Sequence, residues 1–377
     1  MLLDVAKLPQ RSHPLALVAG FLVSGAGLSA LILWLRRKRC FGISLGVRSM
    51  LAAWQQQQTP VEPSADFLAA ARKARDEGVA TLSALERFLS IRPSWSKETN
   101  IRVAYQKVLS SHDGKCIPIR IISSKKNSQD AAPLCLYIHG GGWVFLGNGS
   151  HDHIGNYLAQ NGNVVTVMVD YRLSPEHKYP VPLNDCMDAF KWCVANSRAL
   201  GTDPNHFVVA GDSAGGNLAL AVCMKAREEQ LKVPVLRQLL VYPCVSRRLV
   251  NAKGGSYEKF YTGWNLTRQT MQWFWHMYLG VDVDSALSPS VEMHAAPLDA
   301  DVHLGDLPPT FILLADHDVL YDDGILLADK LRSAGVPVKV DAVGFTLHGM
   351  FAQRGWDTTA WDIFMEKSLQ WILQAKS

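Results

Sequence analysis

The sequence lacks the cysteine patterns that mark a metal-binding or disulfide-stapled protein. Its seven cysteines among 377 residues show neither the paired spacing of a zinc site nor the density of a disulfide scaffold. Because seven is an odd number, at least one cysteine has no partner within the chain. We therefore expect no metal site and no cofactor, and the cysteines leave the redox compartment open.

The chain also lacks a strong excess of either charge. Its net charge is +4, and the basic excess lies in residues 1–50, which hold seven lysines and arginines against one aspartate. The remainder is slightly acidic, which argues against a nucleic-acid partner. Hydrophobic residues make up 48% of the chain and charged residues 19%, so we expect one large domain with insertions.

One long uncharged run stands out near the amino terminus. Pro14–Leu35 spans 22 residues without a charged side chain, and Arg36–Arg39 follows it directly. The run is long enough to cross a bilayer. It is too long for a typical signal-peptide core and lacks a small-residue cleavage site after it. The sequence therefore predicts a retained transmembrane helix with a basic flank over residues 1–40.

The orientation of this anchor is left open by the residues. The basic cluster after the run outweighs Lys7 and Arg11 before it, which favours a cytosolic domain. Two glycosylation sequons, at Asn148 and Asn265, favour the secretory lumen. Asn148 lies just past a glycine loop that we assign to the site below, so we expect it to be unmodified and keep Asn265 as the candidate glycosylation site.

The rest of the chain predicts an α/β fold. Residues 41–100 are typical of a helical cap segment, and residues 101–123 alternate as two antiparallel strands joined near Asp113. Short apolar strands then alternate with helices, a pattern that favours a mostly parallel, doubly wound sheet. Strands are expected at 134–139, 164–171, 207–210, 236–242, 310–315 and 338–343, and helices at 153–161, 183–198, 216–229, 322–334 and 357–374.

The alternation stops over residues 247–308, which form an insertion rich in aromatic residues. Two interpretations stay open for it. It is a helical subdomain that packs its own small core, or it is a lid whose apolar inner wall accepts part of a substrate. The aromatic residues concerned are Tyr257, Phe260, Tyr261, Trp264, Trp273, Phe274, Trp275 and Tyr278.

The segment Gly211–Gly215 predicts a nucleophile elbow. Ser213 stands between two glycines at the point where an apolar strand meets a helix-forming run. A turn sharp enough to expose the serine hydroxyl has no room for Cβ atoms two positions before and after it, which explains Gly211 and Gly215. The following helix directs unpaired N–H groups toward the serine and favours negative charge there.

A serine nucleophile needs a base and an acid that orients the base. His348 follows the expected strand at 338–343, and Asp318 follows the expected strand at 310–315. Asp316 remains an alternative acid, whereas Asp322 and Asp323 are explained by stabilisation of a helix start. The order serine, aspartate, histidine is that of the α/β-hydrolase fold.

A glycine-rich loop follows the expected strand at 134–139. His139 is followed by three consecutive glycines, which expose backbone N–H groups to a substrate oxygen, and the amide of Ala214 is a further donor. No Gly-Lys-Ser or Gly-Lys-Thr follows, which argues against a phosphate loop. We expect His139 to orient this loop, and we expect His151 and His153 to cap a helix or face solvent rather than to bind a metal.

Four motifs together resemble the hormone-sensitive-lipase family of serine hydrolases. They are His139-Gly-Gly-Gly-Trp143, Asp170-Tyr-Arg-Leu-Ser-Pro-Glu176, Gly211-Asp-Ser-Ala-Gly-Gly216 and Asp318-x-Leu320-x-Asp322-Asp-Gly324. The resemblance covers residues 101–377, and with the anchor it is most similar to the arylacetamide deacetylase branch. One departure is the segment Gly344–His348, whose phenylalanine and histidine are spaced differently from the family pattern.

This resemblance implies a hydrolase domain over residues 101–377 that cleaves small-molecule or lipid esters of apolar character. It implies a triad of Ser213, Asp318 and His348 and an oxyanion hole of Gly140, Gly141 and Ala214, with Gly142 in support. It also implies an endoplasmic-reticulum membrane protein with a luminal domain. An amidase, which uses the same machinery, and a catalytically silent paralogue that binds lipid or a partner are the alternatives.

Overall fold

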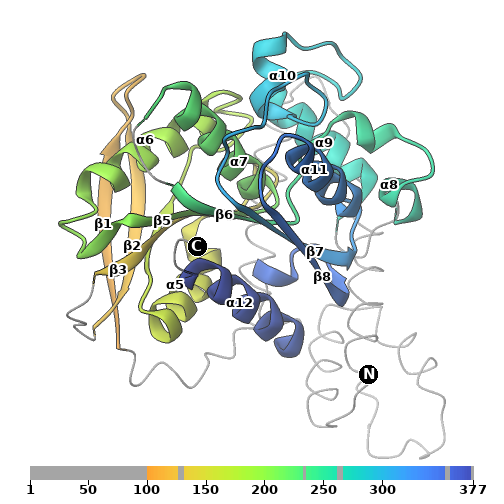
Figure 1. Ribbon diagram of the computed structural model, residues 1–377. Helices are drawn as coiled ribbons and strands as arrows, with labels where there is room; N and C mark the ends of the chain where they lie inside the picture. Colours follow the sequence, from red (N-terminus) through yellow and green to blue (C-terminus); the bar gives the residue numbers. More distant parts are fainter. Residues whose placement is uncertain (1–99, 126–130, 232–234, 261–265, 353–356, 375–377) are drawn as a thin grey trace, which may run out of the picture. The chain divides into compact units, whose positions relative to one another are not determined.

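The computed structural model describes residues 100–125, 131–231, 235–260, 266–352 and 357–374 (Figure 1). The chain divides into two units, and every described residue belongs to the second, Gln55–Ser377. The predicted anchor at 1–40, nearly all of the predicted cap segment at 41–100, and the sequon residue Asn265 lie outside these ranges. Within the described ranges, no helix has the length and apolar character needed to cross a bilayer.

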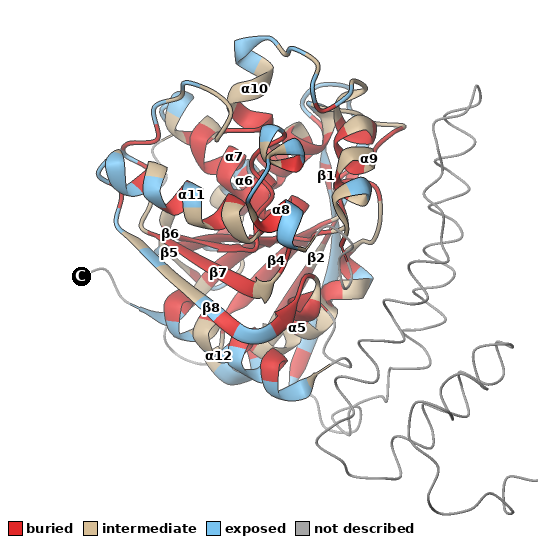
Figure 2. Cartoon of the chain, turned by 90° about the vertical axis from the view of Figure 1, so that its right-hand side faces the viewer, coloured by how far each residue is buried: buried red, intermediate tan, exposed pale blue. Residues whose placement is uncertain are grey.

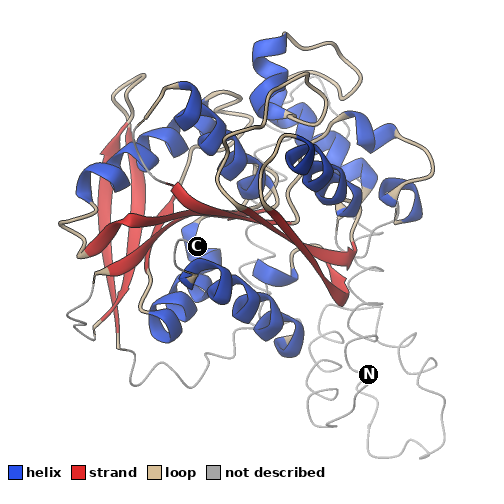
Figure 3. Cartoon of the chain, in the orientation of Figure 1, coloured by secondary structure: helices blue, strands red, loops and turns tan. Residues whose placement is uncertain are grey.

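An eight-stranded sheet, in the order β1-β2-β4-β3-β5-β6-β7-β8, forms the centre of the described fold (Figure 3). β1 and β2 form an antiparallel hairpin, β2 also pairs antiparallel with β4, and all other neighbours are parallel. The predicted mostly parallel sheet is confirmed. The strands are Ile101–Leu109, Cys116–Ser124, Ala132–Ile138, Val165–Val169, Thr202–Asp212, Val235–Val241, Thr310–His317 and Val338–Leu347, numbered β1 to β8 in chain order.

The apolar runs of the sequence become the inner strands of this sheet. Every residue of β4 is buried, as a strand covered on both faces requires. β1, at one edge, exposes most of its residues. The polar–apolar alternation that predicted the first hairpin therefore marks the edge of the sheet, and the continuous apolar runs mark its middle.

Helices cover both faces of the sheet. α6 (Val181–Asn196), α7 (Ala214–Glu228) and α11 (Tyr321–Ser333) lie on one face, and α5 (Asn148–Gly162) and α12 (Thr358–Leu373) lie on the other (Figure 1). Their inner sides are buried against the strands, and α7 is buried over nearly its whole length (Figure 2). The buried side chains accordingly form two apolar clusters, one in each layer.

The insertion between β6 and β7 is helical. It contains η3 (Arg248–Asn251), α8 (Ser256–Lys259), α9 (Arg268–Leu279) and α10 (Pro289–Ala295). α10 is bonded to α7, because the Asn217 side-chain amide donates to the carbonyl oxygen of Ala295 over 2.8 Å and His294 Nε2 lies 2.9 Å from a carboxylate oxygen of Glu228. The insertion is therefore anchored on the helix that follows the predicted nucleophile.

Two predicted boundaries are wrong in ways that affect the site. The helix expected from residue 153 begins at Asn148, which brings residues 148–152 into α5. The strand expected to end at Val343 continues to Leu347 with one residue, Phe345, in a left-handed conformation (φ 59°). Both changes decide where a histidine lies, His151 in the first case and His348 in the second.

Candidate active site

Ser213 stands in the turn between β5 and α7 with φ 56° and ψ −122°, a conformation that non-glycine residues rarely adopt. The turn is closed by the flanking glycines. A Cβ on Gly211 would lie 2.3 Å from the carbonyl oxygen of Gly215, and a Cβ on Gly215 would lie 2.0 Å from that of Ile138. Glycine is therefore required at both positions, as the sequence pattern predicts for a nucleophile elbow.

The three predicted triad residues lie in one chain of contacts. His348 Nε2 lies 3.0 Å from Ser213 Oγ, and His348 Nδ1 lies 2.7 Å from a carboxylate oxygen of Asp318. The other Asp318 oxygen accepts a hydrogen bond from the amide of Leu320 over 3.0 Å. All three side chains are buried. Each follows the carboxyl end of a parallel strand, which is why residues distant in sequence meet here.

Asp316, the alternative acid, points to another partner. Its carboxylate accepts hydrogen bonds from the amides of Phe345 and Thr346, both over 2.8 Å, and from His317 Nδ1. Partial burial raises the pKa of Asp316, but the bonds from His317 and the two amides outweigh burial and hold the pKa below its ordinary value. Asp316 therefore fixes the left-handed turn at Phe345, which accommodates the unusual spacing before His348.

Asp322 and Asp323 do not cap α11. The helix has no side-chain cap bond, and Asp323, fully buried, accepts hydrogen bonds from the amides of Val245 and Ser246 over 2.8 and 3.1 Å. Asp322 accepts one from the amide of Ser256 over 2.7 Å. Both aspartates therefore tie the segment that carries Asp318 to the insertion.

The glycine loop differs from the prediction at one oxyanion donor, Gly140. The amide of Gly140 donates to Asp212 Oδ1 over 3.0 Å, so it is already paired and is not free to bind an oxyanion. Among the described residues, no acceptor pairs with the amides of Gly141, Gly142 and Ala214. The free amides of the loop therefore begin one residue later than the sequence suggested.

The loop has no space for side chains at its other two glycines. A Cβ on Gly141 (φ 114°) would lie 2.2 Å from the carbonyl oxygen of Phe145, and a Cβ on Gly142 (φ 61°) would lie 2.3 Å from the ring of Phe274 in α9. The ring of Trp143 stacks on that of Tyr278 with centroids 4.2 Å apart. The insertion thus packs directly on the loop, and Phe274, Trp275 and Tyr278 belong to the apolar cluster on this side of the sheet. The lid interpretation stays a prediction, and Tyr261 and Trp264 lie outside the described residues.

His139 orients the loop, as expected from its position. Its Nδ1–H donates to the carbonyl oxygen of Gly140 over 2.7 Å, and its ring stacks on Tyr171 with centroids 4.3 Å apart. Burial, followed by the positive charge of His151, lowers the pKa of His139 to about 4. The ring is neutral at physiological pH and unsuited to carry protons for the reaction.

This depressed pKa predicts a stability that depends on pH. Since the ordinary histidine pKa is 6.5 and that of His139 is about 4, the unfolded state binds more protons between these values, and stability falls as pH falls from 6.5 to 4. We expect His139 to contribute about 3 kcal/mol to this loss. Urea unfolding across this range measures it for the wild type and for His139→Asn, which keeps a donor near Gly140 but does not titrate.

The same comparison contains its control. Carboxylates that titrate in this range affect both proteins alike, so only the difference between the two pH slopes reports on His139. Equal slopes for wild type and His139→Asn would show that His139 is not protonated preferentially in the unfolded chain.

The segment 148–153 holds no metal cluster in the described structure. Asp152 pairs with Arg120. His151, expected to cap a helix or face solvent, is instead completely buried, with Nε2 3.2 Å from Asp212 Oδ1. Asn148 is also buried and its side-chain amide donates to the carbonyl oxygen of Met168 over 2.9 Å. That geometry supports the expectation that this sequon is unmodified.

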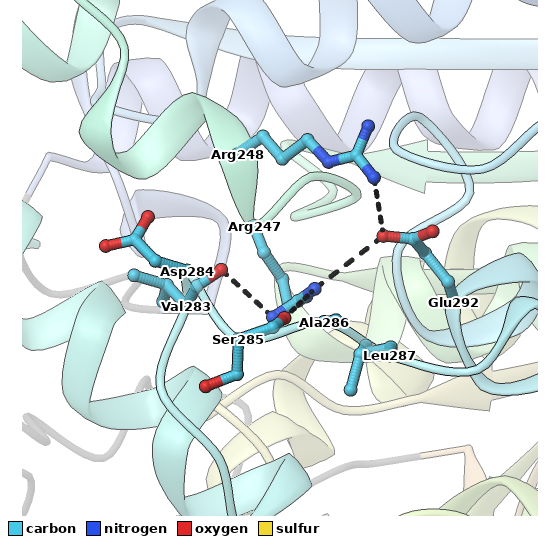
Figure 4. Close-up of a pocket in the computed structure, with 8 residues that line it drawn as sticks. All are labelled: Arg247, Arg248, Val283, Asp284, Ser285, Ala286, Leu287 and Glu292. Atoms are coloured by element: carbon cyan, nitrogen blue, oxygen red, sulfur yellow. Dashed lines mark hydrogen bonds and ion pairs between the residues drawn. The ribbon is translucent and has the colours of Figure 1, made fainter.

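A cavity of about 380 Å³ lies in the insertion, and none of the predicted catalytic residues lines it (Figure 4). Arg247, almost fully buried, donates to the carbonyl oxygens of Val283 and Ser285 over 2.9 and 3.0 Å. Glu292 lies 3.6 Å from Arg247 and 3.0 Å from Arg248. Both arginines of the cavity therefore share one carboxylate, and Arg247 serves to fix the loop around Ser285.

Residues 135–352 match the family described as the alpha/beta hydrolase fold. The chain belongs to this family. Among curated members, it is 32% identical over 242 residues to an ethyl acetate hydrolase of Pseudomonas putida. The aligned region covers 64% of this chain and 73% of the Pseudomonas protein. It is 28% identical over 298 residues to the arylacetamide deacetylase of Oryctolagus cuniculus, and this alignment covers 64% of this chain and 74% of the deacetylase.

The solved structures agree with the sequence matches. The esterase of the archaeon Pyrobaculum calidifontis superposes with a TM-score of 0.72 at 30% sequence identity, over 86% of this chain and 96% of that one. The sequence-based assignment to an α/β-hydrolase of the hormone-sensitive-lipase type is therefore confirmed.

The sequence assigned no role within this α/β-hydrolase site to Asp212 or to His151. Asp212 stands inside the elbow motif, and its position at a strand end directly before the nucleophile is a signal that marks it as a site residue. His151 gave no such signal, because its burial follows from the early start of α5.

Proposed function

We propose that this α/β-hydrolase cleaves carboxylic esters of apolar substrates by acyl transfer to Ser213. The observation that carries the proposal is the continuous series of contacts from Ser213 Oγ through His348 to Asp318, at 3.0 and 2.7 Å. Relatives named as ethyl acetate hydrolase, carboxylesterase and esterase support ester chemistry. The arylacetamide deacetylase relative gives amide hydrolysis as the alternative.

Acylation begins when the Ser213 hydroxyl donates its proton to His348 Nε2 and Oγ attacks the ester carbonyl carbon. Asp318 accepts the hydrogen bond of His348 Nδ1–H and stabilises the imidazolium that forms. The amides of Gly141, Gly142 and Ala214 bind the oxyanion of the tetrahedral intermediate. His348 then protonates the departing alcohol.

Deacylation repeats these steps with water as the nucleophile. His348 takes a proton from water, the resulting hydroxide attacks the acyl carbon, and the proton returns to Ser213 Oγ as the carboxylic acid leaves. No metal or organic cofactor takes part in this scheme.

The surroundings of the glycine loop support an apolar substrate. Phe145 lies beside Trp273 and Phe274 of α9, with ring centroids 5.7 and 5.8 Å apart. Phe274 also contacts the backbone at Gly142. Aromatic side chains next to the proposed oxyanion donors favour an apolar acyl or alcohol group over a charged one.

A fluorophosphonate probe and a pair of chromogenic substrates test the proposal. Wild-type protein should react covalently at Ser213 and hydrolyse p-nitrophenyl esters faster than the matching p-nitroanilides, and Ser213→Ala should do neither. Faster cleavage of the anilide would show that the protein is an amidase rather than an esterase. A wild type that neither labels nor hydrolyses either substrate would make the chain a silent paralogue.

We further propose that residues 14–35 anchor the hydrolase in the endoplasmic-reticulum membrane with residues 101–377 in the lumen. The uncharged run and the resemblance to the deacetylase branch support this arrangement. A mobility shift after glycosidase treatment, absent from Asn265→Gln, is the expected result. Protein that pellets with membranes but never carries a sugar in a sequon introduced at an exposed position of the described domain would favour the cytosolic orientation.

A further inference from the structure

Three groups converge on one oxygen of Asp212, the residue before the proposed nucleophile. Tyr137 Oη donates to Oδ1 over 2.6 Å, the Gly140 amide donates to it over 3.0 Å, and His151 Nε2 lies 3.2 Å from it. Asp212 is 2% exposed and His151 is fully buried. A buried carboxylate with this many partners is held in one position, and it holds the glycine loop in turn.

The partners of His151 define its protonation state. Ser150 Oγ lies 2.7 Å from the carbonyl oxygen of Gly147, which only accepts, so the single hydroxyl proton is used there. His151 Nδ1, 2.7 Å from the same Oγ, must then donate its proton. Nε2 faces the Asp212 carboxylate at ion-pair distance, off the line of a hydrogen bond, where a lone pair would be repelled. An imidazolium fits both neighbours, because its Nδ1–H donates to Ser150 and its positive charge faces the Asp212 carboxylate.

The neighbouring groups agree with a charged His151. Burial raises the pKa of Asp212, but the positive charge of His151 and the bond from Tyr137 outweigh burial, and the net pKa is lowered. His139, whose ring centroid lies 5.7 Å from that of His151, is kept neutral. Asp152 adds a further carboxylate to the field at His151.

The loop is held from both sides of Gly140. Asp212 binds the Gly140 N–H, and His139 binds the Gly140 carbonyl oxygen over 2.7 Å. That carbonyl shares a planar, trans peptide unit with the N–H of Gly141, so fixing the oxygen directs the Gly141 N–H to the opposite side. The direction of a proposed oxyanion donor therefore depends on His139 at the Gly140 carbonyl and on Asp212 at the Gly140 N–H.

We propose that His151 and Asp212 form a buried imidazolium–carboxylate pair that positions the glycine loop for transition-state binding. The role rests on the proposed function, since the loop matters to catalysis only if its amides bind an oxyanion. His151 touches neither substrate nor the triad, and it acts through Asp212 and Gly140. His151 is therefore a positioning residue. This role explains why a charge pair is buried next to the elbow.

The test compares His151→Gln with the wild type and with His206→Gln. His206 is a matched histidine bonded to the carbonyl oxygen of Ile372, outside the site. For His151→Gln we expect kcat/KM for a p-nitrophenyl ester to fall about 10- to 100-fold and Ki for an aryl trifluoromethyl ketone to rise by the same factor. The KM of the ester stays within about twofold. His206→Gln should match the wild type in all three.

A merely structural role predicts a different pattern. Loss of folded protein lowers the number of active sites found by fluorophosphonate titration but leaves the Ki of the remaining sites unchanged. If His151→Gln does not fold, Ser150→Ala decides the question. It removes the acceptor of the His151 Nδ1–H, together with the local bond to the Gly147 carbonyl oxygen, and should move Ki and kcat/KM together by about 3- to 10-fold.

The outcomes separate this proposal from the proposed function. A wild type that labels and hydrolyses esters, with His151 and Ser150 variants whose Ki values match it, would overturn the positioning role alone. A wild type that neither labels nor hydrolyses esters would overturn the esterase proposal and this role together. Parallel changes in Ki and kcat/KM support both.

Discussion

Asp318→Asn is expected to lower kcat for ester hydrolysis by about four orders of magnitude while leaving the fold intact. Both carboxylate oxygens of Asp318 accept hydrogen bonds, one from His348 Nδ1–H and one from the amide of Leu320. Asparagine has a single carbonyl oxygen, so one of these donors would face its NH₂ group. Where the amide keeps its bond to Leu320, the histidine is held with its proton on Nε2 and cannot accept the proton of Ser213.

Asp316→Asn is the matched control. Its carboxylate binds the turn at Phe345 and not the catalytic histidine, so we expect kcat within about fivefold of the wild type. Stopped assays with a p-nitrophenyl ester measure both variants, and thermal unfolding shows that both are folded. A large loss in Asp316→Asn with a small one in Asp318→Asn would exchange the roles assigned to the two aspartates.

The architecture of the described domain follows directly from the sequence. Continuous apolar runs such as the one in β4 can be satisfied only by burial on both faces, and their alternation with helices leaves a parallel sheet as the solution. Ser213, Asp318 and His348 could be predicted for the same reason. Each follows a strand, and parallel strands bring their carboxyl ends to one edge.

The pairing of the loop amides could not be read from the sequence. Three adjacent glycines are equivalent as a pattern, and the choice among them is made by Asp212, which stands 72 residues away along the chain. The prediction for His151 is wrong because a histidine near a helix start can either cap the helix or be buried against the sheet, and the sequence is the same in both cases. Only the packing of α5 against the sheet distinguishes them, and a single sequence does not report that packing.

Gly215→Ala is expected to destabilise the domain by about 3 kcal/mol or more and to abolish fluorophosphonate labelling of Ser213. The added Cβ would lie 2.0 Å from the carbonyl oxygen of Ile138 and 2.5 Å from that of His139. Both are backbone atoms of the strand end that carries the glycine loop. α7 and β3 must therefore separate, and this movement takes the nucleophile away from the proposed oxyanion donors.

Gly149→Ala is the control for this prediction, because its Cβ would meet nothing within 4 Å. Gly149 lies in the first turn of α5, where alanine restricts the unfolded chain more than glycine does. We expect a gain of up to about 1 kcal/mol and unchanged labelling. Urea unfolding and probe reactivity measure both variants. Equal stability of Gly215→Ala and Gly149→Ala would mean that the elbow can widen to accept a side chain. Glycine at position 215 would then be required for the reaction and not for folding.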